Sequence, residues 1–232
     1  MLKNIKKIKI WLPLTCLIAI SAGLIAAPVS HSGNKTPESN VSLSSQKNSS
    51  PDISAFKPLL NDIRQRFPKH PIDPLIIISA SEQKMYLIEH NTLSQAYAIS
   101  TAEAGLGSRS GSNQTPLGVH RIAQKFGDKA APGTIFKARR NTGRIAKILT
   151  QPGARSKADN VTTRIMWLSG LEEGINKGGK VDSHKRYIYI HGTDEEGRLG
   201  KPASHGCIRM TNQGVIEVFN KVPVGTLVDI IE

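Results

Sequence analysis

Cysteine is nearly absent from this sequence of 232 residues, which contains only Cys16 and Cys207. Cys16 lies inside an apolar stretch, 10–27, that has no charged side chain, whereas Cys207 lies among polar residues near the C-terminus. The two thiols therefore belong to different environments, and we expect no disulfide between them. This excludes a small fold held together by disulfides and leaves Cys207 as a lone thiol that needs an explanation.

Aromatic and acidic residues are also scarce. Aromatic residues make up 5% of the chain, and 18 acidic residues stand against 31 Lys and Arg, for a formal net charge of +13. Such a charge favours an anionic partner: a nucleic acid, a membrane face or an acidic polymer. Binders of single-stranded nucleic acid interleave aromatic and basic side chains, and this sequence does not. We therefore expect no nucleic-acid partner.

The N-terminus has the pattern of an export signal. Four lysines precede the apolar stretch 10–27, whose 18 residues are also just long enough to span a bilayer. Residues 1–27 are predicted to be a signal peptide or an uncleaved signal anchor, and the sequence leaves both open. The remainder is expected to be exported to the periplasm or cell-wall space. It stays anchored to the inner membrane through residues 10–27 if the signal is uncleaved.

Three further segments follow. Residues 28–51 are rich in Ser, Asn, Pro and Lys and poor in large apolar side chains, which predicts a flexible stalk. Residues 52–71 repeat apolar side chains at helical spacing, so we expect a helical lead-in that begins near Pro58. Residues 72–232 form the main domain.

Short strand patterns dominate residues 72–232. A helix is expected near 212–220, with Thr211 as its cap. Many short strands with one or two helices predict a mainly β domain, a sandwich or a partly closed barrel. Strands are expected at 75–78, 85–88, 96–100, 119–122, 162–168, 186–191 and 226–231.

Residues 127–160 interrupt this pattern with eight Lys or Arg, two acidic residues and several glycines. Loops of this length inside compact domains are usually functional or disordered. The sequence leaves two interpretations open, a basic lid over a cleft and a solvated surface excursion.

The residues around the lone thiol carry the chemical signal. A free thiol has a pKa of about 8.5 and needs a neighbouring base to become a nucleophile. His191 and His205 each supply an imidazole, and spacing alone allows either to be that base. Gly206 permits close approach of the backbone to a ligand. The informative segments are His191-Gly192 and Ser204-His205-Gly206-Cys207-Ile208-Arg209.

A cation and backbone N–H groups near Cys207 could also assist a nucleophilic thiol. Arg209 adds a cation that favours the thiolate or holds a substrate carboxylate. The backbone N–H groups around Gly206 and Cys207 could receive a developing oxyanion.

Two rival interpretations remain. A zinc site could use His184, His191, His205 and Cys207, but His-x-Cys is unlike the usual chelating pairs, so we expect neither metal nor cofactor. A non-catalytic exported wall-binding protein would make Cys207 a buried structural residue.

The two motifs together resemble the L,D-transpeptidase (YkuD-type) catalytic domain. Thr115-Pro116-Leu117-Gly118 resembles an upstream segment of the same family, and the resemblance covers roughly residues 72–232. It implies a mainly β fold and cleavage before a terminal D-alanine of a peptidoglycan tetrapeptide stem. The acyl group then passes to an amine acceptor, in cell-wall cross-linking or remodelling. Transfer to water, as in an L,D-carboxypeptidase, is the alternative.

The resemblance also implies residue roles in a cysteine acyltransferase. Cys207 matches the nucleophile, which forms a thioacyl intermediate, and His191 matches the general base. No metal is implied. Four residues match positions that shape or support the substrate and oxyanion site: His205, Gly206, Ser204 and Arg209.

Overall fold

The computed structural model describes residues 53–232, which contain ten strands and two α-helices. The signal predicted at 1–27 and the stalk predicted at 28–51 lie outside the described residues. The strands are β1 (Leu75–Ser79), β2 (Lys84–Glu89), β3 (Thr92–Ala98), β4 (Gly118–Phe126), β5 (Thr134–Lys137), β6 (Arg140–Ile145), β7 (Val161–Gly170), β8 (Tyr189–Thr193), β9 (Ile208–Met210) and β10 (Leu227–Ile231). The helices are η1 (Ile53–Phe56, 3-10), α1 (Lys57–Arg66), η2 (Glu196–Arg198, 3-10) and α2 (Asn212–Lys221).

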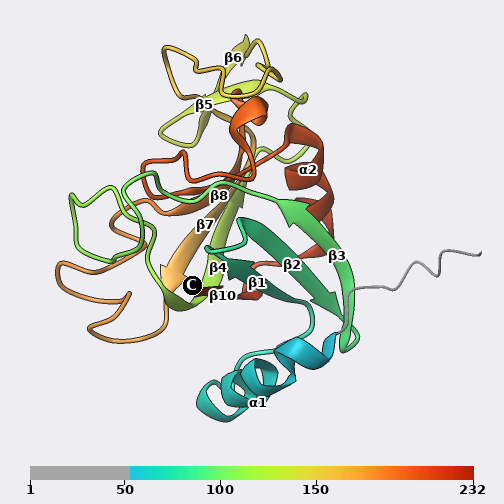
Figure 1. Cartoon of the computed structure of the whole chain (residues 1–232), viewed down its shortest axis with the longest axis vertical. Helices are drawn as coiled ribbons and strands as arrows, with labels where there is room; N and C mark the ends of the chain where they lie inside the picture. Colours follow the sequence, from blue (N-terminus) through green and yellow to red (C-terminus); the bar gives the residue numbers. More distant parts are fainter. Residues whose placement is uncertain (1–52) are drawn as a thin grey trace, which may run out of the picture. The chain divides into compact units, whose positions relative to one another are not determined.

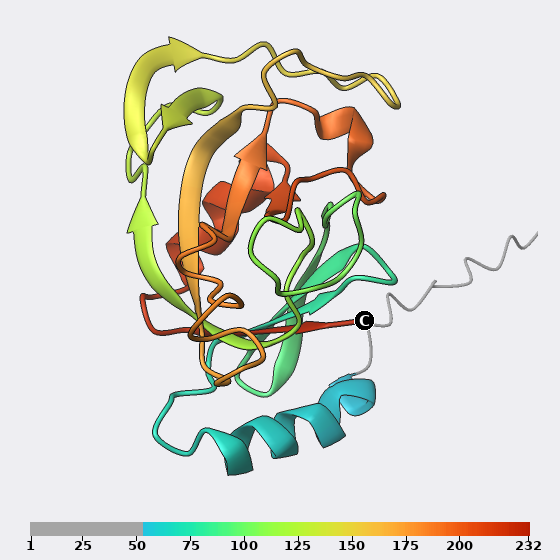
Figure 2. The ribbon, with the colours of Figure 1, turned by 90° about the vertical axis from the view of Figure 1, so that its left-hand side faces the viewer.

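All ten strands join one curled sheet. Its main path runs β3-β2-β1-β10-β4-β7-β5-β6, and β8 branches from β7 to pair with β9. Figure 1 shows the β5–β6 hairpin and α1 at opposite ends of this unit, and Figure 2 shows the long strands bending as the sheet curls. The predicted mainly β class is confirmed, with a partly closed, curled sheet.

The apolar run at 75–78 explains why the sheet has a core on both faces. Side chains alternate along β1, so Ile76 and Ile78 enter one apolar cluster while Leu75 and Ile77 enter another. A strand covered on both faces reads as a continuous apolar run rather than an alternating one. Strand β1 lies between β2 and β10, which places this run in the interior of the sheet.

Each α-helix covers one of the two clusters. Leu60 and Ile63 of α1 are buried in the same cluster as Leu75 and Ile77. Helix α2 contacts β7 and β8 and contributes Val215 to the other cluster. Within residues 53–232, no helix is long and apolar enough to cross a membrane.

The ends of the helices follow their sequence signals. Pro58 stands in the first turn of α1, where its missing N–H leaves no hydrogen bond unmade. Thr211 caps α2 by accepting a hydrogen bond from the Gly214 N–H at 3.0 Å, which confirms the predicted cap.

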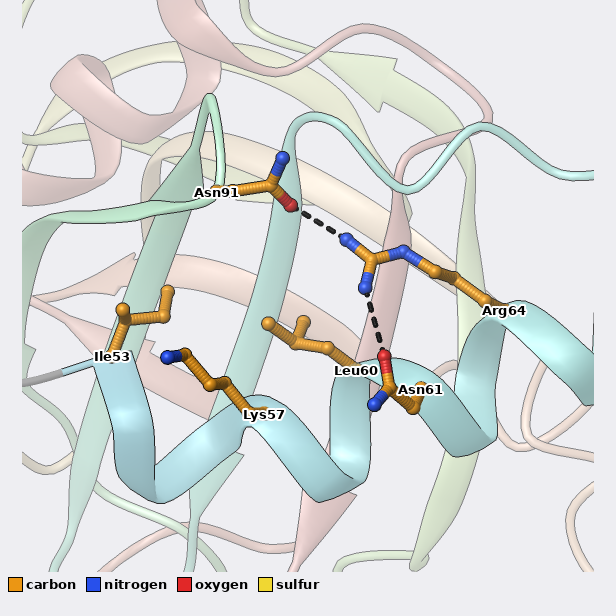
Figure 3. A pocket seen from close by; sticks show the side chains of 6 residues that line it. All are labelled: Ile53, Lys57, Leu60, Asn61, Arg64 and Asn91. Carbon is orange, nitrogen blue, oxygen red and sulfur yellow. Dashed lines mark hydrogen bonds between the residues drawn. The ribbon is translucent and has the colours of Figure 1, made fainter.

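A pocket of about 320 Å³ lies between α1 and the turn that joins β2 to β3 (Figure 3). The Arg64 guanidinium donates to the side-chain oxygens of Asn61 and Asn91, which ties the helix to that turn. The pocket contains no thiol, imidazole or carboxylate, so it is not the candidate active site. Its lining residues are Ile53, Lys57, Leu60, Asn61, Arg64 and Asn91.

Four strands differ from the sequence-based expectations. The strand expected at 186–191 begins only at Tyr189, because Tyr187 has φ +57° and turns the chain before the strand. The short β9 has only three residues and was not expected. Strands β5 and β6 lie within the segment 127–160, which therefore contains a hairpin rather than one continuous loop.

Candidate active site

The two motifs meet because β8 and β9 are adjacent parallel strands. Ile190 pairs with Ile208, and His191 pairs with Arg209. The two isoleucines face the apolar core, so His191 and Arg209 face the other side of the sheet. Cys207 directly precedes Ile208 and therefore lies on the same side as His191, one pair further along.

The Cys207 thiol is half-buried against an apolar cluster formed by Phe136, Ile165, Trp167 and Tyr189. The Tyr189 N–H donates to Sγ at 3.4 Å, and Sγ donates to the carbonyl oxygen of Tyr187 at the same distance. Burial raises the pKa of the thiol to about 11, although the Tyr189 N–H and the Arg209 charge oppose this. At neutral pH the resting thiol is therefore protonated and needs a base.

His191 has the properties of such a base. Its side chain is 3% exposed, and burial lowers the pKa of the imidazole to about 4. Nδ1 lies 2.8 Å from the carbonyl oxygen of Gly192. A carbonyl oxygen only accepts, so Nδ1 carries the proton and Nε2 keeps a free lone pair. At neutral pH the imidazole is uncharged and can accept a proton through Nε2.

The same burial predicts acid instability. An unfolded histidine takes up its proton at about pH 6.5, but folded His191 and the equally buried His120 do so only near pH 4. The unfolded chain therefore binds more protons between these values, so the free energy of unfolding falls as the pH drops. Buried Asp229, with its pKa raised to about 6, acts in the opposite direction.

We expect the wild-type chain to lose roughly 3 kcal/mol of unfolding free energy between pH 7 and pH 4.5. The Asp229→Asn variant removes the opposing carboxyl and is expected to lose roughly 5 kcal/mol over the same interval. Urea denaturation at both pH values measures the difference. A smaller acid loss in Asp229→Asn than in the wild type would contradict these assignments.

Ser204 fixes the turn that precedes the thiol. Its hydroxyl donates to the carbonyl oxygen of Cys207 at 2.5 Å and accepts from the Gly206 N–H at 3.1 Å. The Thr115 hydroxyl donates to the Gly206 carbonyl at 3.0 Å, so the Thr-Pro-Leu-Gly segment at 115–118 also stabilises this turn. The Gly206 N–H is thus occupied, and the expectation that it receives an oxyanion does not fit this geometry.

Gly206 is required at its position for two reasons. Its φ of +124° belongs to a region that side chains other than glycine rarely adopt. An added Cβ would also lie 3.3 Å from the Gln114 carbonyl oxygen and 3.4 Å from Ile188 Cδ1. The tight turn before Cys207 therefore depends on a residue without a side chain.

Arg209 is buried among acids rather than presented to a ligand. The side chain is 2% exposed, with Nη2 2.5 Å from Asp159 Oδ1 and Nη1 2.9 Å from Glu195 Oε2. Glu195 also accepts from the Ser156 N–H and the Arg198 guanidinium. The expected contact between Arg209 and a substrate carboxylate does not fit this arrangement, because two carboxylates of the chain already occupy the guanidinium.

His205 lies outside the buried part of the site. Its side chain is 72% exposed, and Nδ1 is 2.8 Å from Asp159 Oδ2. Asp159 therefore joins His205 to Arg209 through its two oxygens. His205 also lines a pocket of about 240 Å³ together with Arg186 and Tyr187, whose carbonyl oxygen accepts from the Cys207 thiol.

The basic segment 127–160 contacts this site at two places. The tip of the β5–β6 hairpin places Arg139 over Trp167, with the guanidinium carbon 4.4 Å from the ring centroid. The far end places Asp159 on His205 and Arg209. Sequence reasoning missed Asp159 and Glu195. Asp159 had a weak signal as one of two acids in a basic segment, and Glu195 had none.

The alternative zinc site would need its histidines and Cys207 to converge on one point. Within residues 53–232, no three or more His, Cys, Asp and Glu side chains are grouped so that they could hold a metal ion. His184 instead stacks on Trp167, with ring centroids 3.9 Å apart and planes within 7°. Its carbonyl oxygen accepts from the Trp167 indole N–H.

Comparisons with known proteins point to one family. The family model described as the L,D-transpeptidase catalytic domain matches residues 73–230. "Putative L,D-transpeptidase YkuD" of Bacillus subtilis is 43% identical over 60 residues, which cover 24% of this chain and 37% of that protein. "Probable L,D-transpeptidase YbiS" of Escherichia coli is 45% identical over 47 residues, covering 20% and 15%.

These alignments span well under two thirds of the relatives' own lengths. Among solved structures, L,D-transpeptidase 3 from Mycobacterium tuberculosis aligns with a TM-score of 0.44 and 13% identity, over 69% of this chain and 61% of that one. The family model covers most of residues 53–232, including both motifs around the thiol. The chain therefore belongs to the L,D-transpeptidase catalytic domain family.

Proposed function

We propose that this chain is an L,D-transpeptidase that acts on peptidoglycan tetrapeptide stems through a thioester on Cys207. One observation carries the proposal: a neutral thiol and a neutral imidazole with a free Nε2 lie on the same side of the β8–β9 pair. The family membership supports the substrate class, and the geometry supports the roles of Cys207 and His191.

The first half-reaction is acylation of the thiol. His191 Nε2 takes the thiol proton as Cys207 Sγ attacks the carbonyl carbon that precedes the terminal D-alanine. The tetrahedral intermediate collapses, the C–N bond breaks, and the imidazolium returns the proton to the leaving amine. Free D-alanine departs and the stem remains as a thioester.

The second half-reaction regenerates the enzyme. An acceptor amine attacks the thioester carbonyl, His191 takes a proton from the attacking nitrogen, and the sulfur leaves and is protonated again. The new amide joins two stems. Splitting amide exchange into two steps lowers the barrier that a direct exchange would face.

We assign the oxyanion to the N–H of Cys207 itself. The Gly206 N–H is donated to Ser204 Oγ, whereas the Cys207 N–H has no acceptor among the described residues. An unpaired donor beside the attacked carbonyl stabilises the charge that develops in the transition state. Ser204 and Gly206 then support the site by shaping the turn that aims this donor.

His205 and Arg209 have different roles in this proposal. His205 and Tyr187 line one pocket, and the Tyr187 carbonyl accepts from the thiol, so we place the stem in that pocket. Arg209 positions Asp159, and through it His205, rather than binding substrate. The proposal uses no metal.

Export fits this substrate, because peptidoglycan lies outside the cytoplasmic membrane. We propose that residues 1–27 direct the domain to the periplasm or cell-wall space. If the signal is uncleaved, residues 10–27 keep it at the membrane.

Incubation of the full-length chain with a disaccharide-tetrapeptide tests the proposal, with products identified by mass spectrometry. Cross-linked dimers together with free D-alanine are the expected products. Release of D-alanine without dimers, even with an added amine acceptor, would indicate an L,D-carboxypeptidase. Binding of the fragment without any product would indicate a non-catalytic wall-binding protein.

The pH dependence of kcat/KM tests the role of His191. The base must be unprotonated, and its pKa is about 4, so kcat/KM is expected to stay level down to about pH 5 and to fall only near pH 4. Circular dichroism at each pH separates this fall from unfolding. An acidic limb near pH 6.5, the ordinary value for an exposed imidazole, would assign the base to another histidine.

A further inference from the structure

Three of the arginines around the site are already occupied. Arg209 and Arg198 share the carboxylate of Glu195. The Arg186 guanidinium donates to the carbonyl oxygens of Gly107 and Gln114, at 3.2 and 2.6 Å. Glu195 therefore neutralises Arg198 and Arg209, and backbone carbonyls hold Arg186 in the fold around the thiol.

Arg139 differs from them. Its Nη1 donates to the Tyr189 hydroxyl at 3.0 Å, and its guanidinium lies over the rings of Trp167 and Tyr187, 4.4 and 5.4 Å from their centroids. No carboxylate among residues 53–232 lies within ion-pair distance of Arg139, and the side chain is half-buried. The aromatic rings hold the guanidinium in place, and its other N–H groups can donate to a planar anion such as a carboxylate.

The aromatic side chains that hold Arg139 also surround the thiol. Tyr189 donates its backbone N–H to Cys207 Sγ and accepts from Arg139 at its hydroxyl. The Tyr187 carbonyl accepts from the thiol, while its ring lies under the guanidinium. Trp167 and Tyr189 pack in the same apolar cluster as Cys207. A stem attached to the thiol would therefore extend along this aromatic wall.

The backbone of the β5–β6 turn fixes Arg139 in place. Lys137 pairs with Arg140, so the turn consists of Ala138 and Arg139, with φ of +45° and +66°. Two-residue turns of this kind favour Asn and Gly, and other residues persist there only when their surroundings hold them. The contacts with Trp167 and Tyr189 provide that support, so the cation is positioned before a ligand arrives.

We propose that Arg139 binds a carboxylate of the donor stem and makes the site selective for anionic donors. This inference rests on the proposed transpeptidase function. Two carboxylates share the required chemistry: the terminal one of the leaving D-alanine and a side-chain one on the residue that is attacked. Both belong to the residues that flank the amide bond that Cys207 breaks.

Three donors distinguish these sources: a tetrapeptide fragment with free carboxylates, one amidated at the terminal carboxylate, and one amidated at the side-chain carboxylate. For the free donor, Arg139→Gln is expected to lower kcat/KM by about 10- to 100-fold, the effect of losing charge-assisted hydrogen bonds. One of the two amidated donors lacks the carboxylate that Arg139 binds. The wild type is expected to process that donor slowly, and Arg139→Gln is expected to process it no more slowly than the wild type does. The donor that behaves in this way identifies the bound carboxylate.

Arg140→Gln is the matched control, because Arg140 is the exposed neighbour on the same hairpin. It should leave all three donors unchanged. Equal losses by Arg139→Gln on all three donors, or no loss on any, would overturn the inference in favour of a structural role or none. Thermal melting checks that the variant is folded.

Calorimetric binding of the three donors to Cys207→Ala, with and without Arg139→Gln, separates the inference from the proposed function because it needs no turnover. If the wild type processes no donor, the proposed function fails. In that case, carboxylate binding by Arg139 is supported only if Arg139→Gln weakens the binding of the donor with free carboxylates. Unchanged binding of that donor would overturn the inference.

Discussion

Replacing Cys207 with Ala is expected to lower the release of D-alanine by about three orders of magnitude or more, because no other group can form the acyl intermediate. Cys207→Ser should be almost as inactive, since a hydroxyl is a weaker nucleophile than a thiol and His191 is a weak base with a pKa of about 4. The unfolding free energy should change by only about 1 kcal/mol, because the side chain is small and half-buried. Initial rates with the tetrapeptide donor measure the loss.

Cys16→Ala is the matched control, because it removes the other cysteine of the chain. It should retain wild-type rates. Full activity in Cys207→Ala would show that the thiol is not the nucleophile, and the proposed mechanism would then be wrong.

Replacing Arg209 with Met is expected to destabilise the domain by about 3–5 kcal/mol, the largest stability effect that we expect from any single substitution here. The change removes the cation that Asp159 and Glu195 share, and buried Glu195 then keeps Arg198 as its guanidinium partner. Removing one cation from a buried ion network costs more than the ion pair contributes on balance, because the buried carboxylate is then only partly compensated. Urea denaturation measures the loss, with an unchanged dependence on denaturant as the check on two-state behaviour.

Two variants sharpen this test. Arg155→Met removes an exposed ion pair with Glu103 and should cost at most about 1 kcal/mol. Adding Glu195→Gln to Arg209→Met removes the buried carboxylate that has lost one of its two guanidinium partners, and it should restore part of the lost stability. If Arg209→Met costs no more than Arg155→Met, the buried network does not hold the site together.

The parts of the fold that the sequence predicts well are those with a local signal. The run at 75–78 is apolar at every position because β1 is buried on both faces, and Thr211 precedes a helix whose first turn needs an acceptor. The thiol motif is compact in sequence and forms one tight turn, so spacing alone indicates that His205, Gly206 and Cys207 lie together.

The missed elements depend on contacts that are distant in sequence. The turn at Ala138–Arg139 lacks the Asn or Gly that usually marks a hairpin, and packing of Arg139 on Trp167 stabilises it instead. Tyr187 interrupts the strand pattern with φ +57°, and its carbonyl oxygen accepts a hydrogen bond from the Cys207 thiol. Neither contact leaves a local signature.

The sequence alone also does not reveal the roles of the charged residues. Arg209 follows the thiol by two residues, which suggests substrate contact, but its partners Asp159 and Glu195 lie 50 and 14 residues away in sequence. Which of His191 and His205 serves as base was likewise open. The burial of His191 and its bond to Gly192, against the exposure of His205, support His191.

The mass of the enzyme during turnover shows whether the donor stem becomes attached to Cys207. The full-length chain is mixed with the tetrapeptide donor without acceptor and quenched in acid within one turnover, and the intact protein and its peptides are weighed. The proposed mechanism predicts an adduct equal to the donor minus alanine, located on the peptide that contains Cys207 and absent from Cys207→Ala. Release of D-alanine with no adduct at Cys207, or with an adduct elsewhere, would contradict it.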